Sequence, residues 1–219
     1  MTPLQIRAVL DGQIMDPKVR LDGLLAAVSA ERLGMPPVHA SGTELDRHLE
    51  ELRSEVAKIL QWEGRFFLCS DPSFEVEEWE RRHITKRFPT DRAATQGSEK
   101  VRRIEISTGL SKNYRIPARA CFLRDDRIIW HALGEQAAVL SALGEVLYLG
   151  KKRSLGLGKV RDWKVVPCES WAGFPVLRDG VPLRAVPVDY PGVQMHRIAL
   201  DTLVFPHWDH TRKVPCAVA

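Results

Sequence analysis

The residues best suited to chemistry lie between 150 and 160, in the run Gly-Lys-Lys-Arg-Ser-Leu-Gly-Leu-Gly-Lys-Val. Glycine permits positive φ and a close approach of the backbone to another molecule. Cations beside exposed N–H groups suit an anion, above all a polyphosphate. The run lacks the ending of a P-loop and the G-x-G-x-x-G spacing of a dinucleotide-binding turn, and it follows a predicted helix instead of opening one. This pattern favours a nucleic-acid backbone over a nucleotide cofactor, with contacts expected from Gly150, Lys151, Lys152, Arg153, Ser154, Gly156, Gly158 and Lys159.

A structural explanation covers part of the same run. Gly150 can be the residue that ends a helix, with Lys151 and Lys152 placed favourably against the helix dipole. This explanation does not account for Gly156 and Gly158. Helix termination and phosphate binding therefore both stay open at this point.

Charge is distributed unevenly along the 219 residues, whose net charge is +4. Residues 1–80 contain 8 Lys/Arg and 15 Asp/Glu, a balance of −7, whereas residues 81–119 contain 11 and 3, a balance of +8. So basic a block is an electrostatic footprint for nucleic acid, and the acidic first third should face away from that ligand or toward another protein. The expected contacts in this block are Arg81, Arg82, Lys86, Arg87, Arg102, Lys112, Tyr114 and Arg115.

Hydrophobic periodicity predicts one α+β domain over residues 1–219. A first helix begins at Leu21 and ends at Met35-Pro36-Pro37, and Ser41-x-x-Glu44 has the form of a capping box before an amphipathic helix. That second helix is expected over 42–60, and a third over 135–149. Strands are expected over 4–10, 64–70, 118–123, 127–132 and 159–166, the third and fourth of them joined as a hairpin about Asp125-Asp126.

This order of elements is the ferredoxin-like (RRM-like) βαββαβ plan, a common nucleic-acid scaffold that does not dictate function. The basic segment 71–116 is then an insertion, a mobile hairpin or arm in which only 101–106 looks strand-like. Residues 168–219 form a β-rich C-terminal extension, with strands expected over 181–188 and 195–204 as a second small sheet.

Composition narrows the class of protein. Hydrophobic residues make up 44% of the chain, enough for a folded core, and no apolar run is long enough to cross a bilayer. The N-terminus lacks the layout of a signal peptide. The four cysteines are scattered without a C-x-x-C pair, which indicates reduced thiols and a cytoplasmic protein.

Three motifs together resemble a known family. The glycine run, placed between a helix and a strand, resembles the loop of the RAMP superfamily of CRISPR-associated RNA-binding proteins. The segment Arg127-Ile-Ile-Trp130-His-Ala-Leu-Gly134 resembles the strand before that helix, and Leu21-Asp22-Gly23-Leu24-Leu25-Ala26 resembles the first helix of type IV members. Within type IV the chain is most similar to the subunit that caps the guide RNA (crRNA) at its 5′ repeat-derived handle. The motifs do not cover the basic arm or the C-terminal tail.

The resemblance implies a non-catalytic crRNA-binding subunit of a type IV CRISPR ribonucleoprotein, without a cofactor. It implies that Gly150, Gly156 and Gly158 shape a loop along the RNA backbone, with charge from Lys151, Lys152, Arg153 and Lys159. It also implies that the 71–116 arm is a thumb on the RNA and on the adjacent helical backbone subunit. Other effector subunits and target DNA are further candidate partners.

A guide-processing endoribonuclease of the same superfamily is the alternative. Metal-independent RNA cleavage needs a base, an acid and a cation near the phosphate. Tyr114 with Lys112 and Arg115, or His83 with Lys86 and Arg87, could supply them. Each set is explained equally well by phosphate contact and base stacking, so no catalytic residue is expected.

Two further groups of histidines bear on the question of a catalytic or metal site. His131 lies in an apolar strand and is expected to be a hydrogen-bonded core residue. His207-x-x-His210 with Cys216, and with Cys168 as a fourth group, offers zinc-ligand types but no standard spacing. We therefore expect no metal site.

Overall fold

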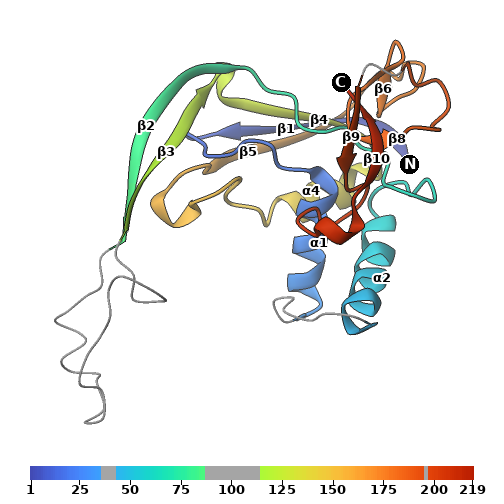
Figure 1. The fold of residues 1–219 in the computed structure, drawn as a ribbon, viewed down its shortest axis with the longest axis horizontal. Coiled ribbons are helices and arrows are strands. Elements are labelled where there is room, and N and C mark those ends of the chain that lie inside the picture. The colour runs from blue at the N-terminus through green and yellow to red at the C-terminus, as the bar shows by residue number, and fades with distance from the viewer. Residues whose placement is uncertain (36–42, 87–113, 195–196) are drawn as a thin grey trace, which may run out of the picture.

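The computed structural model describes residues 1–35, 43–86, 114–194 and 197–219. In this part of the chain, three α-helices combine with antiparallel sheets in an α+β fold (Figure 1). None of the helices described is long and apolar enough to cross a membrane.

The central sheet is built on β1 (Thr2–Leu10), which lies between β4 (Arg127–Gly134) and β5 (Val160–Pro167) and is antiparallel to both. Isolated bridges join the other edge of β4 to the chain that follows α2, through the pairs Leu60–Gly134, Cys69–Ala132 and Ser73–Ile129. The predicted strand over 64–70 is thus represented by single bridges and buried side chains beside β4, not by a regular strand.

The helices cover one face of this sheet (Figure 1). They are α1 (Leu21–Arg32), α2 (Thr43–Ala57) and α4 (Gln136–Leu143). The alternation predicted for β1 is confirmed, because four side chains on its helix-facing side have no exposed area: Leu4, Ile6, Ala8 and Leu10. The helical spacing predicted for α2 is confirmed by the burial of Leu45, Leu49, Leu52 and Val56. The capping box at Ser41 lies outside the described residues.

The predicted hairpin between 118–123 and 127–132 is wrong. β3 (Tyr114–Leu123) pairs with β2 (Val76–Lys86), whereas β4 pairs with β1. Asp125 and Asp126 both have positive φ, and they turn the chain from one sheet into another. The physical reason is burial: the apolar side chains of β4, such as Trp130, reach the core only beside β1.

The third helix is shorter than predicted. It ends at Leu143, and Gly144 forms its C-terminal cap. The chain then extends, and Tyr148 pairs with Lys159 at the start of β5. The apolar residues that follow Gly144 therefore pack as extended chain, which an apolar periodicity alone does not distinguish from helix.

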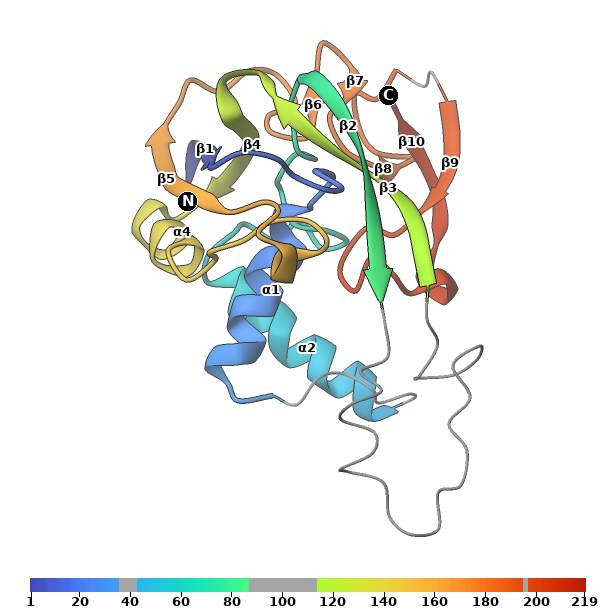
Figure 2. The same cartoon turned by 90° about the vertical axis from the view of Figure 1, so that its left-hand side faces the viewer.

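β2 and β3 form a two-stranded ribbon, here called the arm, that leaves the central sheet and curves away from it (Figures 1 and 2). Its strands extend from Val76 to Lys86 and from Tyr114 to Leu123. The predicted strand over 101–106 lies outside the described residues.

The C-terminal extension forms two small sheets. One has the order β8-β10-β9, from Val186–Pro187, Val214–Val218 and Arg197–Asp201. The other pairs β6 (Leu177–Arg178) with β7 (Val181–Pro182). A second buried cluster joins the extension to residues 66–68, which precede the bridge at Cys69: Phe66, Leu68, Val176, Leu177, Val186 and Ala217.

A buried ionic cluster also attaches the extension to α1. His207 Nε2 lies 2.9 Å from the unexposed carboxylate of Asp22, and Arg184 Nη2 lies 3.7 Å from it. Arg20 Nη1 donates to His207 Nδ1, so the ring proton is on Nε2 and is donated to Asp22. Burial would raise the pKa of Asp22, but the positive charge of Arg184 and the hydrogen bond from His207 outweigh it and lower the pKa to about 2.

Candidate nucleic-acid interface

Cations gather on one face of the arm. Residues that pair directly across an antiparallel ribbon project from the same face. Arg81 pairs with Arg119, and Thr85 pairs with Arg115, so three guanidinium groups share a face and are exposed there. A hollow of about 330 Å³ is lined by Arg81, Pro117, Ala118 and Arg119.

Nothing in the described part of the chain neutralises this face. Arg81, Arg115 and Arg119 form no salt bridge there, although Arg82 lies 3.4 Å from Glu80 on the opposite face of the ribbon. Like charges directly opposite each other destabilise a sheet. The Arg81–Arg119 pair has no acidic partner among the described residues, which leaves its positive charge available to an anion.

An aromatic ring accompanies the cations. Trp79 is two residues from Arg81 on the same strand and so projects from the same face. Its side chain is 54% exposed. An exposed indole beside guanidinium groups is the combination that stacks nucleic-acid bases while neutralising phosphates. Neither Trp79 nor Arg119 belongs to the predicted contacts; the alternation along the ribbon could have identified both once the pairing of β2 with β3 was known.

The glycine loop, residues 148–159, begins and ends in the pairing of Tyr148 with Lys159. Two of its three predicted glycines are required by the protein's own backbone. A Cβ on Gly150 would lie 2.3 Å from the carbonyl oxygen of Met15, and one on Gly158 would lie 1.9 Å from that of Leu149. Both have positive φ. At both glycines the backbone approaches another part of the same chain and not a ligand. The spacing of glycines in the sequence does not distinguish these two reasons for a glycine.

The tip of this loop is different. Residues 151–156 are exposed, and a Cβ on Gly156 would meet no atom within 4 Å. Lys152 has the left-handed conformation (φ 61°) and precedes the single turn Arg153–Leu155. Of the predicted cations, Lys151 pairs with Asp16 at 2.7 Å and Lys159 with Asp11 at 2.9 Å. Lys152 and Arg153 form no salt bridge with any residue whose position is described, so they are available to an anion.

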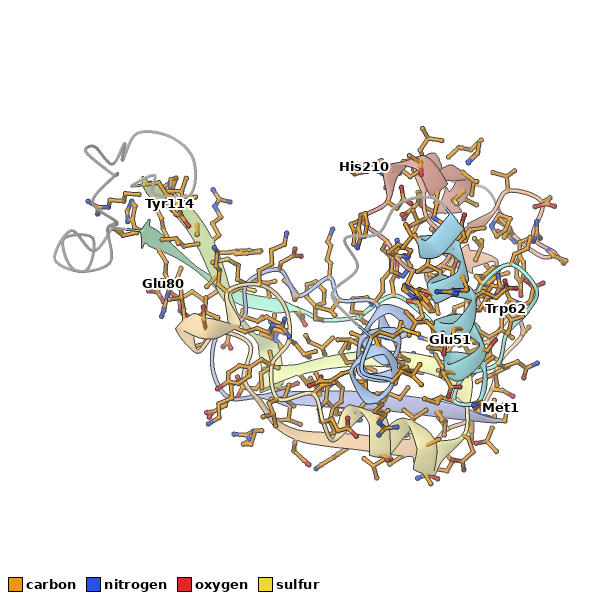
Figure 3. The ribbon with its side chains drawn as sticks, turned by 90° about the horizontal axis from the view of Figure 1, so that it is seen from below. Met1, Glu51, Trp62, Glu80, Tyr114 and His210 are labelled. Carbon is orange, nitrogen blue, oxygen red and sulfur yellow. The ribbon has the colours of Figure 1, made fainter. Side chains whose placement is uncertain are left out.

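The glycine loop and the arm are neighbours, and the contact between them includes Glu80 on the face of the ribbon opposite Arg81. The segment 11–16 lies between them: Gly158 N donates to Gln13 O at 2.7 Å, and the backbones of Ile14 and Cys121 exchange hydrogen bonds of 3.0 and 2.9 Å. The amide of Gln13 also hydrogen-bonds the Glu80 carboxylate and lowers its pKa. Figure 3 shows Glu80 at the end of the arm near the loop and Tyr114 toward the arm's far end. The exposed cations of loop and arm therefore lie on connected elements at one end of the molecule.

The remaining predicted arm residues are only partly described. Tyr114 and Arg115 lie at the start of β3, where Tyr114 pairs with Lys86. Arg87, Arg102 and Lys112 lie outside the described residues. Each of the two sets considered for RNA cleavage includes one of these residues, so neither set can be assembled here. Ser154 lies at the exposed loop tip.

The histidines near the C-terminus serve the ionic cluster. His207 is held by Asp22, Arg20 and Thr202. The Cys216 thiol lies 3.8 Å from the carbonyl oxygen of Asp201. Within the described ranges, no three His, Cys, Asp or Glu side chains are placed to hold a metal ion. His131 is half-buried; its ring contacts Trp171 edge-on at 5.1 Å, and burial, with Arg178, lowers its pKa.

Comparison with known proteins adds no assignment: no family model matches the chain, and no curated protein matches it significantly.

The two kinds of glycine predict different mutational effects. Gly158→Ala forces a Cβ against a backbone carbonyl, and we expect it to lower the free energy of unfolding by more than about 2 kcal/mol. Gly156→Ala meets open space and carries only the cost of positive φ, about 1 kcal/mol. Urea denaturation of both variants measures the difference. Equal losses would contradict the structural role assigned to Gly158.

Proposed function

We propose that the chain is a non-catalytic RNA-binding subunit of a type IV CRISPR ribonucleoprotein, of the RAMP type, that binds the 5′ handle of the crRNA and contacts the adjacent backbone subunit. The observation that carries the RNA-binding part is the face of the arm where Arg81 and Arg119 stand opposite each other without an acidic partner in the described chain. The assignment to the RAMP superfamily rests on the resemblance of three motifs: the glycine run and the segments 127–134 and 21–26.

The sheet supports a ferredoxin-like scaffold. Its lateral order is the bridge segment 69–73, then β4, β1 and β5, each antiparallel to its neighbour. In chain order these are the second, third, first and fourth elements of the sheet, which is the order that a βαββαβ plan with two right-handed crossovers generates. The arm then occupies the connection between the second and third elements, as expected for an inserted thumb.

The proposed mechanism is electrostatic and geometric. Phosphates of the handle are neutralised by the arm face and by the loop-tip cations Lys152 and Arg153. Splayed bases stack on Trp79, whereas Tyr114, which pairs with Lys86, projects from the opposite face of the ribbon. Phosphate contacts fix the path of the RNA and carry no sequence information, so base contacts or handle shape must supply specificity.

Salt dependence tests this function directly. Fluorescence anisotropy with a labelled single-stranded RNA carrying the repeat-derived 5′ sequence measures log K against log salt for the wild type and for Lys152→Ala/Arg153→Ala. We expect the magnitude of the slope to fall by about 0.7 for each phosphate that the substitutions leave without a cation. Lys151 is left intact because its salt bridge to Asp16 complicates interpretation.

The matched control removes two cations from another surface. Arg53→Ala/Lys58→Ala acts on α2 and the turn after it, where both side chains pair with glutamates of the same helix, and should leave the slope unchanged. Equal slopes for the loop-tip variant and the wild type would remove the tip from the interface. Site-specific cleavage of a repeat hairpin in EDTA would instead favour the endoribonuclease.

A further inference from the structure

A second group of cations lies outside the arm, in a cleft of about 750 Å³ between the C-terminal extension and the residues beside β4. Its charged lining comprises Lys18, Arg20, Arg178, Arg184, Arg197, Asp71 and Asp201. Figure 3 shows the extension, marked by His210, and the arm, marked by Tyr114, at opposite ends of the molecule. None of its lining residues belongs to β2 or β3, so the cleft is separate from the arm face proposed above.

The floor of the cleft is fixed by internal contacts. Arg20 lies 3.2 Å from Asp71 and 2.5 Å from Asp201, so both acidic groups of the lining are already paired. Arg184 is 3% exposed and donates to the carbonyl oxygens of Phe67, Cys69 and Leu203. Its Nε has no hydrogen-bond partner among the residues that the structure places. These contacts hold two guanidinium groups rigidly below the cleft.

The rim carries positive charge that the described residues do not neutralise. Lys18, Arg178 and Arg197 are exposed, and none of them forms a salt bridge within the ranges that the structure covers. The two acidic side chains of the lining, Asp71 and Asp201, are both paired with Arg20. The cleft thus favours an anion, and a concave site with low-dielectric walls strengthens that preference.

Planar groups line the same cleft. Arg178 stacks on Trp171 at 4.1 Å from the ring centroid, and Trp171 in turn meets the His131 ring. His131 and Phe74 contribute aromatic surface to the wall. Burial and the nearby Arg178 lower the pKa of His131, so at neutral pH it offers an uncharged ring. A wall of flat groups beside unpaired cations suits a heterocyclic base that carries a phosphate.

We infer that this cleft binds one phosphorylated ribonucleotide, with the phosphate at Lys18, Arg178 and Arg197 and the base against Phe74 and His131. The volume is in the range of small-molecule sites. A free nucleotide and a terminal or splayed nucleotide of an RNA share this chemistry. The site does not depend on the arm, and it would exist if the arm bound nothing.

Calorimetric titration of the full chain with AMP, with adenosine and with a short single-stranded RNA tests the site. AMP should bind saturably, and adenosine at least about tenfold more weakly because the cations act on the phosphate. Lys18→Ala/Arg197→Ala should weaken AMP binding at least about tenfold. Both residues are exposed, so the variant should keep the wild-type melting temperature. Arg53→Ala/Lys58→Ala should bind AMP like the wild type, because it changes a surface outside the cleft.

Each outcome decides the matter. If the rim variant binds AMP more weakly than the wild type and the control variant does not, the result supports a site for free nucleotides. If AMP does not bind but the rim variant weakens RNA binding, the nucleotide comes from the RNA. If the rim substitutions leave both AMP binding and RNA binding unaffected, or if AMP does not bind and the rim variant binds RNA like the wild type, the inference is overturned. The two proposals can fail separately. If the cleft does not bind AMP but the loop-tip substitutions still reduce the salt dependence of RNA binding, the proposed function stands.

Discussion

The double substitution Arg81→Glu/Arg119→Glu is expected to weaken RNA binding by about a hundredfold at moderate salt, or about 2.7 kcal/mol. The two side chains are exposed and cross-strand neighbours. Removing two positive charges and adding two negative ones changes four units of charge at the centre of the proposed phosphate track, where each neutralised phosphate contributes to affinity through counterion release. Anisotropy titrations at two salt concentrations measure the effect, which should shrink as salt rises.

Single substitutions separate binding from folding. Arg81→Glu alone replaces a repulsive cross-strand pair by an attractive one, so the ribbon should become more stable by about 0.2 to 1 kcal/mol while RNA binding weakens. A substitution that stabilises the ribbon but weakens RNA binding indicates that the arginines on this face serve ligand binding and not folding. Arg82→Ala is the matched control, since it changes the adjacent residue on the other face, paired with Glu80. If Arg81→Glu leaves RNA affinity at the wild-type value, the arm face is not the interface.

Local patterns predict the parts of the fold that depend on one segment. The alternation in residues 4–10 and the helical spacing behind Leu45 each identify a buried side, because a single periodicity fixes which side chains face the core. The third helix is predicted too long because apolar residues after Gly144 continue an apolar run, and only their pairing with the start of β5 shows that they are extended.

Local sequence patterns do not predict which distant segments pair with each other. The adjacency of β3 and β4 along the chain suggests a hairpin, yet the ribbon forms with β2 and creates the Arg81–Arg119 pair, which no local pattern contains. The glycine loop shows the same limit in a different way. Its spacing locates the exposed cationic tip, whereas the need for Gly150 and Gly158 arises from Met15 and Leu149 and requires the tertiary structure.

The ionic cluster depends on still more distant residues, and Asp22→Ala is expected to lower the free energy of unfolding by about 3 to 5 kcal/mol. Asp22 has no exposed area and is the anion that faces both Arg184 and His207. Without it, Arg184 stays buried without its nearest counter-charge. Asp22→Ala/Arg184→Met should recover part of the loss, because an apolar pair avoids the desolvation penalty of the charges. Urea denaturation at neutral pH measures both variants.

The pH dependence provides an independent check of the same cluster. The folded pKa of Asp22 is about 2, below its ordinary value of 3.8. The contribution of the ionised Asp22 to the free energy of unfolding is therefore fully present above about pH 4. It is lost as pH falls toward 2, because Asp22 takes up its proton at a higher pH in the unfolded chain than in the folded one. The difference corresponds to about 2 kcal/mol. Asp22→Ala should lose less stability than the wild type over this interval. A variant whose acid limb parallels that of the wild type, or a neutral-pH loss below about 1 kcal/mol, would show that the extension is attached mainly by its apolar contacts with Phe66 and Leu68.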